Sequence, residues 1–300
     1  MSPVPEIRVT RCNEVPVHEK GDYVLYWMTA FRRTRWNFSL QHAVDWANRL
    51  AKPLLVFEAL RIGYPWASDR FHRFVIDGMA NNAEILKKIG VSYYPYLEPS
   101  ADADKGLLAA LSEKACVVVT DDFPAFFLPR MIASASKKIP VCIEKVDSNG
   151  LLPMKAAERV FAAAKFFRLF LQKELPLHLS ELPEAEPLKR LKHKAPALPL
   201  KEILKRWPAA SPEILSGAPE PLAEFPLAHD VGVVDEQGGT GSASKRMKRF
   251  LDKKLSLYEE NRNHPDEDGT SGLSPYLHFG HLSVHEIFHH LAAKEEWDLD

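Results

Sequence analysis

Five short apolar runs alternate with helix-patterned stretches over the first half of the chain, and this alternation limits the folds that it can adopt. Tyr23–Met28 (YVLYWM) is apolar at every position, which is typical of a strand buried on both faces of a sheet. Ser68–Ile89 carries apolar residues at helical spacing, and Gly90 is suited to end that helix. Strand and helix alternating in this way predict right-handed βαβ units and a parallel sheet, an α/β fold of the Rossmann-like kind. The expected strands are 23–28, 53–60, 91–97, 116–120 and 141–146, and the expected helices between them are 40–50, 68–89, 104–115 and 129–138.

Prolines dominate the middle of the chain. An aromatic-rich helical stretch at 161–175 comes first, and prolines then recur every few residues over 176–226. Such a segment cannot sustain long helices or a central strand, so we predict an extended interdomain linker on the surface. Its prolines include Pro183, Pro187, Pro196, Pro199, Pro208, Pro212, Pro219 and Pro221.

Helical periodicity returns after Gly238-Gly239, over 243–262 and again from Ser283 onward. These changes in composition and periodicity divide the chain into three predicted parts. They are an α/β domain at 22–175, the linker at 176–226 and the N-terminal part of an all-helical domain at 227–300.

Charge and cysteine content narrow the class of protein. With 39 Lys and Arg against 40 Asp and Glu, the formal net charge is −1, which excludes a uniformly basic nucleic-acid coat but not a local basic patch. No run of 18 apolar residues occurs, and the first residues lack the basic and apolar regions of a signal peptide. The widely spaced Cys12, Cys116 and Cys142 suit a reducing compartment and offer no disulfide framework. We therefore expect a monomeric cytoplasmic protein without a membrane span.

Common phosphate-binding motifs do not occur in the sequence, which has neither GxGxxG nor GxxxxGK[ST]. The nearest glycine cluster, Gly238–Gly241, follows the linker rather than a strand, and this favours a flexible lead-in to a helix. A basic cluster comes next, which can contact phosphates or form a solvated helix face. Its members are Lys245, Arg246, Lys248, Arg249, Lys253 and Lys254.

The segment His285–His289 (HEIFH) matches HExxH, in which two histidines one helical turn apart bind zinc and the glutamate acts as a base. The longer HExxHxxGxxH form is absent, which leaves Glu295, Glu296 and the final aspartates as candidate third ligands. A structural interpretation uses the same residues: Ser283 and Glu286 form S-x-x-E, a capping box that opens the last helix. We favour the capping box and predict no metal site, so a zinc hydrolase is the lesser alternative.

The most distinctive segment is a polar loop that feeds a helix, DGTSGLSPYLHFGHLS at 268–283. Its hydroxyls and free N–H groups at a helix start could bind an anion, and its glycines let the backbone approach a ligand closely. Ser274-Pro275 is also a good pair for the N-cap and first position of a helix, and by composition alone ordinary capping is the preferred interpretation. The residues concerned are Thr270, Ser271, Ser274, Gly269 and Gly272.

TSGLSPYLHFGHLS closely resembles the flavin-phosphate loop of the photolyase/cryptochrome family, usually written TSxLSPYLxFGxLS. Other segments agree with that family in order, namely VLYWM near the start, DSNGLLP at 147–153, FRLFLQKELP at 167–176, and then GG, RFL and YEENRN. The resemblance covers essentially all 300 residues and is greatest to class II deoxyribodipyrimidine (cyclobutane dimer) photolyases. One departure is AFRRTRWNFSL where that branch usually has DQRVxDNWAL, so no roles are carried over to Arg32, Arg33 and Arg35.

The resemblance implies a flavoenzyme that repairs DNA with light. In this family reduced FAD, excited by blue light, donates an electron to a cyclobutane pyrimidine dimer that has been flipped out of the duplex; the dimer splits and the electron returns. FAD is thus the implied cofactor and UV-damaged DNA the implied partner, with a folate or deazaflavin as antenna pigment in the α/β domain. No catalytic residue is assigned. The positions that match FAD-binding positions of the family are Tyr258, Thr270, Ser271, Gly272, Leu273 and Ser274.

Members of the family continue with a helical domain that completes the flavin pocket and holds the lesion. By resemblance, this chain is expected to lack the C-terminal part of the FAD-binding domain and, by itself, to bind FAD weakly and repair little. A cryptochrome-type photoreceptor, which keeps the flavin but signals instead of repairing, is the main alternative. The class II features disfavour it.

Overall fold

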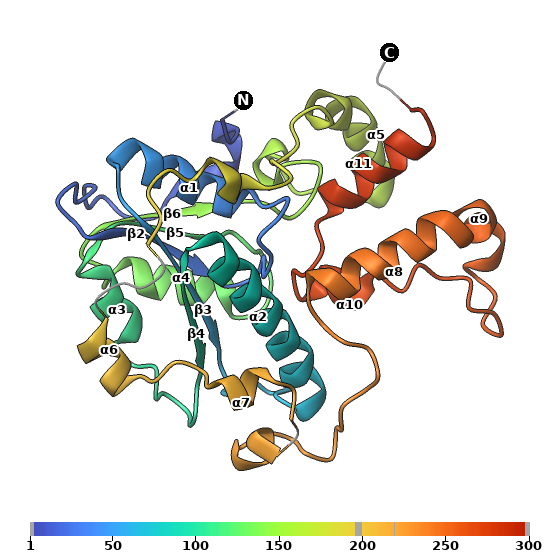
Figure 1. The fold of residues 1–300 in the computed structure, drawn as a ribbon. Coiled ribbons are helices and arrows are strands. Elements are labelled where there is room, and N and C mark those ends of the chain that lie inside the picture. The colour runs from blue at the N-terminus through green and yellow to red at the C-terminus, as the bar shows by residue number, and fades with distance from the viewer. Residues whose placement is uncertain (1–2, 196–199, 219, 298–300) are drawn as a thin grey trace.

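A computed structural model describes residues 3–195, 200–218 and 220–297. Its centre is a six-stranded sheet with the order β1-β6-β5-β2-β3-β4 (Figure 1). Five strands run parallel, and β1 joins the edge antiparallel to β6. The chain therefore reverses its direction of winding at β2, and the neighbouring β2 and β5 flank the point where ligands bind in many open α/β sheets. The strands are β1 Val9–Arg11, β2 Tyr23–Met28, β3 Leu54–Leu60, β4 Ser92–Leu97, β5 Ala115–Asp121 and β6 Cys142–Val146.

Helices cover both faces of this sheet because alternate residues of the buried strands point to opposite sides. Val24 and Tyr26 of β2 pack in one apolar core with α1 and α2, whereas Leu25 and Trp27 pack in another with α3, α4 and α6. None of the helices in the described residues is long and apolar enough to cross a membrane. The α-helices are α1 Phe38–Leu50, α2 Asp69–Ile89, α3 Leu107–Ser112, α4 Leu128–Ser136, α5 Ala164–Glu174, α6 Lys201–Arg206, α7 Pro212–Leu215, α8 Thr240–Lys253, α9 Tyr258–Asn261, α10 Ser274–His278 and α11 Val284–Lys294. Short 3₁₀ helices lie at Glu6–Arg8, Met154–Ala156, Leu175–His178, Pro187–Arg190, Glu220–Glu224 and Leu255–Leu257.

The α/β fold class and all five predicted strands are confirmed, with ends that shift by at most one residue. Gly90 ends α2 as expected: its φ is +83°, and its N–H donates to the carbonyl of Leu86. The helix expected at 104–115 is shorter, because Gly106 adopts a φ of +89° immediately before α3 begins. The edge strand β1 was not predicted, since three half-buried residues carry no clear periodicity.

Residues 176–226 differ from the extended surface linker that the prolines predict. Short helices interrupt the segment, and its apolar side chains enter the cores of the α/β domain. Trp207, for example, is 6% exposed, and its indole N–H donates to the carbonyl of Ala103. Prolines prevent long helices here, but they do not prevent the residues between them from being buried. The predicted domain boundaries stay predictions, and Pro196, Pro199 and Pro219 lie outside the described residues. The buried apolar residues are Leu179, Leu188, Leu191, Leu200, Ile203, Trp207 and Leu222.

The C-terminal helices form a layer beside α2 (Figure 1). The helix expected over 243–262 is broken, because α8 ends at Lys253 and a 3₁₀ turn precedes α9. Phe74 of α2 joins the apolar core of this layer, where its ring contacts Tyr276 of α10 at 5.3 Å. The layer is thus packed directly against the α/β domain. Its other buried core residues are Ala243, Met247, Phe250, Leu251, Leu273 and Leu282.

Candidate functional site

The crevice between the carboxyl ends of β2 and β5 is occupied by the chain's own loop. Asp121, the last residue of β5, is fully buried, and its Oδ2 accepts the N–H groups of Thr29, Ala30 and Phe31 at 2.8–2.9 Å. Its Oδ1 accepts the hydroxyl proton of Tyr26 at 2.8 Å. A carboxylate with four donors holds the loop after β2 in one conformation. This loop is therefore a rigid support for the segment around Gly280 that packs against it.

Two arginines of the segment that departs from the family pattern are built into this support. Arg33 is buried, and its guanidinium donates to the carbonyls of Trp36 and Gly280, at 3.3 and 3.2 Å. Burial lowers the pKa of Arg33 to about 10, so the guanidinium stays charged at neutral pH. Arg32 forms an ion pair of 2.9 Å with the fully buried Glu58 of β3. Sequence analysis carried over no role to these arginines because their segment departs from the family pattern.

The loop predicted to bind a cofactor has one buried residue and two exposed ones that carry hydroxyls. Leu273 is 3% exposed and lies in the core of the helical layer, whereas Thr270 and Ser274 are exposed. Ser271 is half-buried, and its Oγ accepts the N–H of Leu273 at 3.4 Å. Gly272 has a φ of +66°, a conformation that favours glycine. These five consecutive residues form the segment that leads into α10.

The start of α10 differs from the predicted capping pair. Leu273 is the N-cap, Ser274 is already the first helical residue, and no side chain caps this end. The helix has only five residues, so its dipole contributes little, and binding of an anion here would depend on side chains. Tyr276 of α10 is buried, and its hydroxyl donates to the carbonyl of Gln237 at 3.0 Å. This bond ties α10 to the segment that precedes α8.

Tyr258, the remaining residue of the predicted site, is half-buried and packs against the apolar core of the same layer. Its ring packs edge-on against Phe250 of α8 with centroids 5.2 Å apart, and the Arg262 guanidinium lies 5.3 Å from the ring centroid. Tyr258 shares this core with Leu273, but its ring contacts are with Phe250 and Arg262, not with the loop hydroxyls. Core packing accounts for its position, and its binding of FAD stays a prediction.

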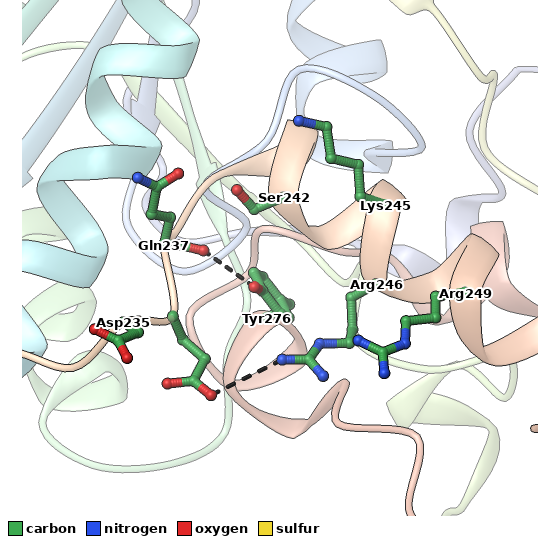
Figure 2. A pocket seen from close by; sticks show the side chains of 8 residues that line it. Asp235, Gln237, Ser242, Lys245, Arg246, Arg249 and Tyr276 are labelled. Carbon is green, nitrogen blue, oxygen red and sulfur yellow. Dashed lines mark hydrogen bonds and ion pairs between the residues drawn. The ribbon is translucent and has the colours of Figure 1, made fainter.

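A charged cleft of about 410 Å³ lies beside the loop, between the segment 235–237, the first half of α8 and Tyr276 (Figure 2). Arg246 links the cleft to the loop: a Cβ added to Gly272 would lie 3.4 Å from its Cδ and Nη1. The helical spacing of the basic cluster places three of its cations along this cleft. The lining residues are Asp235, Glu236, Gln237, Ser242, Lys245, Arg246, Arg249 and Tyr276.

The HExxH residues pack against the α/β domain. His285 is buried with its ring edge-on to Phe38, with centroids 5.3 Å apart, and the His289 ring is tilted against Trp36, with centroids 4.9 Å apart. Ser283 is the N-cap of α11 and accepts the N–H of His285, but Oε2 of Glu286 has no hydrogen-bond partner among the described residues, so only the serine half of the predicted capping box is found. Glu286 is buried, and burial raises the pKa of its carboxyl.

Over residues 3–195, 200–218 and 220–297, no three His, Cys, Asp or Glu side chains are grouped to hold a metal ion. Among the candidate third ligands, Asp298 and Asp300 lie outside the described residues. Both histidines of the motif instead face aromatic rings near the start of α1. The zinc interpretation therefore gains no support from the described geometry.

Known proteins resemble the chain over most of its length. It is 28% identical to the deoxyribodipyrimidine photo-lyase of Methanothermobacter thermautotrophicus over 278 residues, 92% of this chain and 57% of that protein. It is 30% identical to the deoxyribodipyrimidine photo-lyase of Arabidopsis thaliana over 276 residues, 90% of this chain and 53% of that protein. No protein-family model matches the chain.

Solved structures show the same fold. A bacterial class III photolyase from Agrobacterium tumefaciens aligns with a TM-score of 0.62 at 21% identity, covering 90% of this chain and 53% of that one. A Synechocystis cryptochrome aligns with a TM-score of 0.65 at 16% identity, covering 93% and 56%. These similarities support the photolyase/cryptochrome family as the family of this chain. The chain spans about half the length of the curated relatives that it matches.

Proposed function

We propose that this protein is a deoxyribodipyrimidine photo-lyase, which uses FAD and light to split cyclobutane pyrimidine dimers in UV-damaged DNA. The observation that carries the proposal is the TSGLS loop, in which Thr270 and Ser274 are exposed, beside a cleft lined by three cationic side chains. It occurs in a chain whose relatives along 90% or more of its length are named photo-lyases. An antenna pigment of the folate or deazaflavin type in the α/β domain belongs to the same proposal.

The residues around the loop fit the diphosphate of FAD. A diphosphate needs hydroxyl or N–H donors and positive charge, and it needs space for its oxygens. Thr270 and Ser274 supply exposed hydroxyls, and Gly272 leaves its backbone uncovered by a side chain. Lys245, Arg246 and Arg249 supply the charge along the adjoining cleft.

In this proposal the chain positions the cofactor and attracts DNA. The hydroxyls of the loop orient the anionic end of FAD, while Leu273 holds the loop to the helical layer. When bound and reduced, FAD supplies the light-driven electron transfer to the lesion. The exposed Lys248 and Lys253 on α8 add positive charge that favours the phosphates of DNA. The loop that Asp121 holds after β2 fixes the position of the C-terminal helical layer relative to the α/β domain.

The FAD site is tested by removing two hydroxyls of the loop. In the Ser271→Ala/Ser274→Ala double variant, each lost hydrogen bond costs about 0.5–1.5 kcal/mol, so FAD should bind roughly 5- to 150-fold more weakly. Flavin fluorescence during titration of the purified chain measures the affinity. The control is Ser256→Ala, which removes an exposed hydroxyl outside the loop. Equal affinities for the double variant and the wild type would show that FAD binds elsewhere.

Repair is tested with the protein produced from its complete reading frame and purified with reduced flavin. Blue light should restore dimer-containing oligonucleotides to intact pyrimidines, and the same mixture kept in the dark should not change. Chromatographic separation of the digested oligonucleotide measures the yield. A protein that holds reduced FAD but splits no dimers would instead support the photoreceptor alternative.

A further inference from the structure

The Arg246 side chain lies between Glu236 and the loop. On one side its Nη2 lies 3.9 Å from Oε1 of Glu236, the ion pair drawn in Figure 2. On the other side its Cδ and Nη1 lie against Gly272 of the loop. The Arg246 side chain keeps 29% of its surface exposed, so the guanidinium remains accessible from the cleft.

The position of Glu236 is set by the residue that follows it. The carbonyl of Gln237 accepts the hydroxyl proton of Tyr276, which is buried in the helical layer. Gly238, next in the chain, donates its N–H to Asp77 of α2 at 3.1 Å. These two bonds hold the backbone of the 235–238 segment along the cleft, and they keep the carboxylate of Glu236 within reach of Arg246.

A carboxylate and a phosphate use the same face of a guanidinium, because both accept parallel N–H bonds from its planar fork. The existing ion pair is a weak one: it is long, and half of the Glu236 side chain is exposed to solvent. A diphosphate carries more charge and more acceptor oxygens than one carboxylate. It should therefore displace Glu236 from Arg246 when it enters the cleft.

We infer that Glu236 is an internal competitor for the diphosphate of FAD, which occupies Arg246 in the free protein and leaves it when the cofactor binds. This inference rests on the proposed function, since it assigns the regulation of the same site. It makes Arg246 a residue that binds the diphosphate and Glu236 a residue that sets its affinity.

The test is a titration of the 300-residue chain with FAD and, separately, with inorganic pyrophosphate, followed by calorimetry. Glu236→Gln should raise the affinity for both ligands about two- to fivefold, the range expected for loss of an exposed ion pair. Asp235→Asn makes the same change of charge one residue away, without an ion pair to Arg246 among the described residues, and should have a smaller effect. Arg246→Gln should weaken both ligands, and Lys248→Gln, on the exposed face of α8, should weaken them less.

A double variant separates direct competition from a general effect of charge. In Arg246→Gln protein, the additional Glu236→Gln change should bring no gain, because the guanidinium for which Glu236 competes is absent. If FAD binds, but the Glu236→Gln and Asp235→Asn variants bind it with equal affinity, the proposed competition by Glu236 is wrong and the proposed FAD site is retained. If the variants change the affinity for pyrophosphate as expected but FAD does not bind, the assignment of FAD is wrong. Competition between Glu236 and a diphosphate is then still supported. Failure of the wild type to bind either ligand overturns both.

Discussion

Gly280→Ala should destabilise the protein by about 2–5 kcal/mol, the sum of a left-handed alanine and an overpacked contact. Gly280 has a φ of +73°, and an added Cβ would overlap the carbonyl oxygen of Ala30 and lie 2.7 Å from the N of Arg32. Neither neighbour can move easily, because Asp121 binds the N–H of Ala30 and Arg33 binds the carbonyl of Gly280. Urea unfolding followed by circular dichroism measures the change.

Gly241→Ala is the matched control for this experiment. Gly241 lies inside α8 with open space around its Cα, so alanine should be neutral or stabilise by up to about 1 kcal/mol. An unfolding free energy for Gly280→Ala within about 0.5 kcal/mol of the wild type, the usual range for surface substitutions, would show that the loop after β2 yields. The support described around Asp121 would then not be rigid.

Stability should fall steeply when the pH drops below about 6.5, because three histidines are buried in their neutral form. Burial lowers the pKa of His72 to about 4 and the pKa values of His281 and His285 to about 3. In the unfolded chain these groups take up protons near pH 6.5, whereas the folded chain resists protonation until its own lower pKa is reached. Stability is therefore fully present above pH 6.5 and is lost between that pH and about 3–4. Each histidine contributes up to about 1.4 kcal/mol per pH unit.

His281→Asn tests one of the two larger contributions. His281 is fully buried, stacks on Phe74, and accepts the N–H of Gly239 through Nδ1 at 2.9 Å. Asparagine can keep an acceptor near that position but takes up no proton. The slope of unfolding free energy against pH between 4 and 6 should therefore decrease by up to about 1.4 kcal/mol per unit, whatever the variant's stability at pH 8. His264→Asn, at an exposed site, is the control and should leave the slope unchanged.

Other groups with shifted pKa values change the stability in different pH ranges. Burial raises the pKa of Glu286, which favours the folded state at low pH and opposes the histidines. The pKa of Glu144 is lowered by its hydrogen bonds with His42 and Trp46, against the cost of burial, so its contribution is lost only below its unfolded value of 4.5. A pH profile without a steep limb between 6.5 and 4 would show that the buried histidines gain protons without unfolding the protein.

The sequence alone was sufficient for the class of fold. Strands such as Tyr23–Met28 are buried on both faces, so every residue must be apolar, and this is visible in a run of six letters. The end of α2 at Gly90 was equally local, because only glycine adopts its φ without strain. The loop at 270–274 was found by its resemblance to a family motif, and in the structure it leads into α10 with Leu273 buried.

Only the tertiary structure decided which distant residues meet. The pairing of Arg246 with Glu236, the contact of Gly280 with Ala30 and the packing of Trp207 against the sheet domain join segments that no periodicity connects. The same holds for HExxH, whose spacing suits zinc but whose histidines face Phe38 and Trp36. Local sequence patterns report which face of an element is buried, because burial acts on each residue separately. They do not report the partner on that face, because a partner is chosen by the packing of the whole chain.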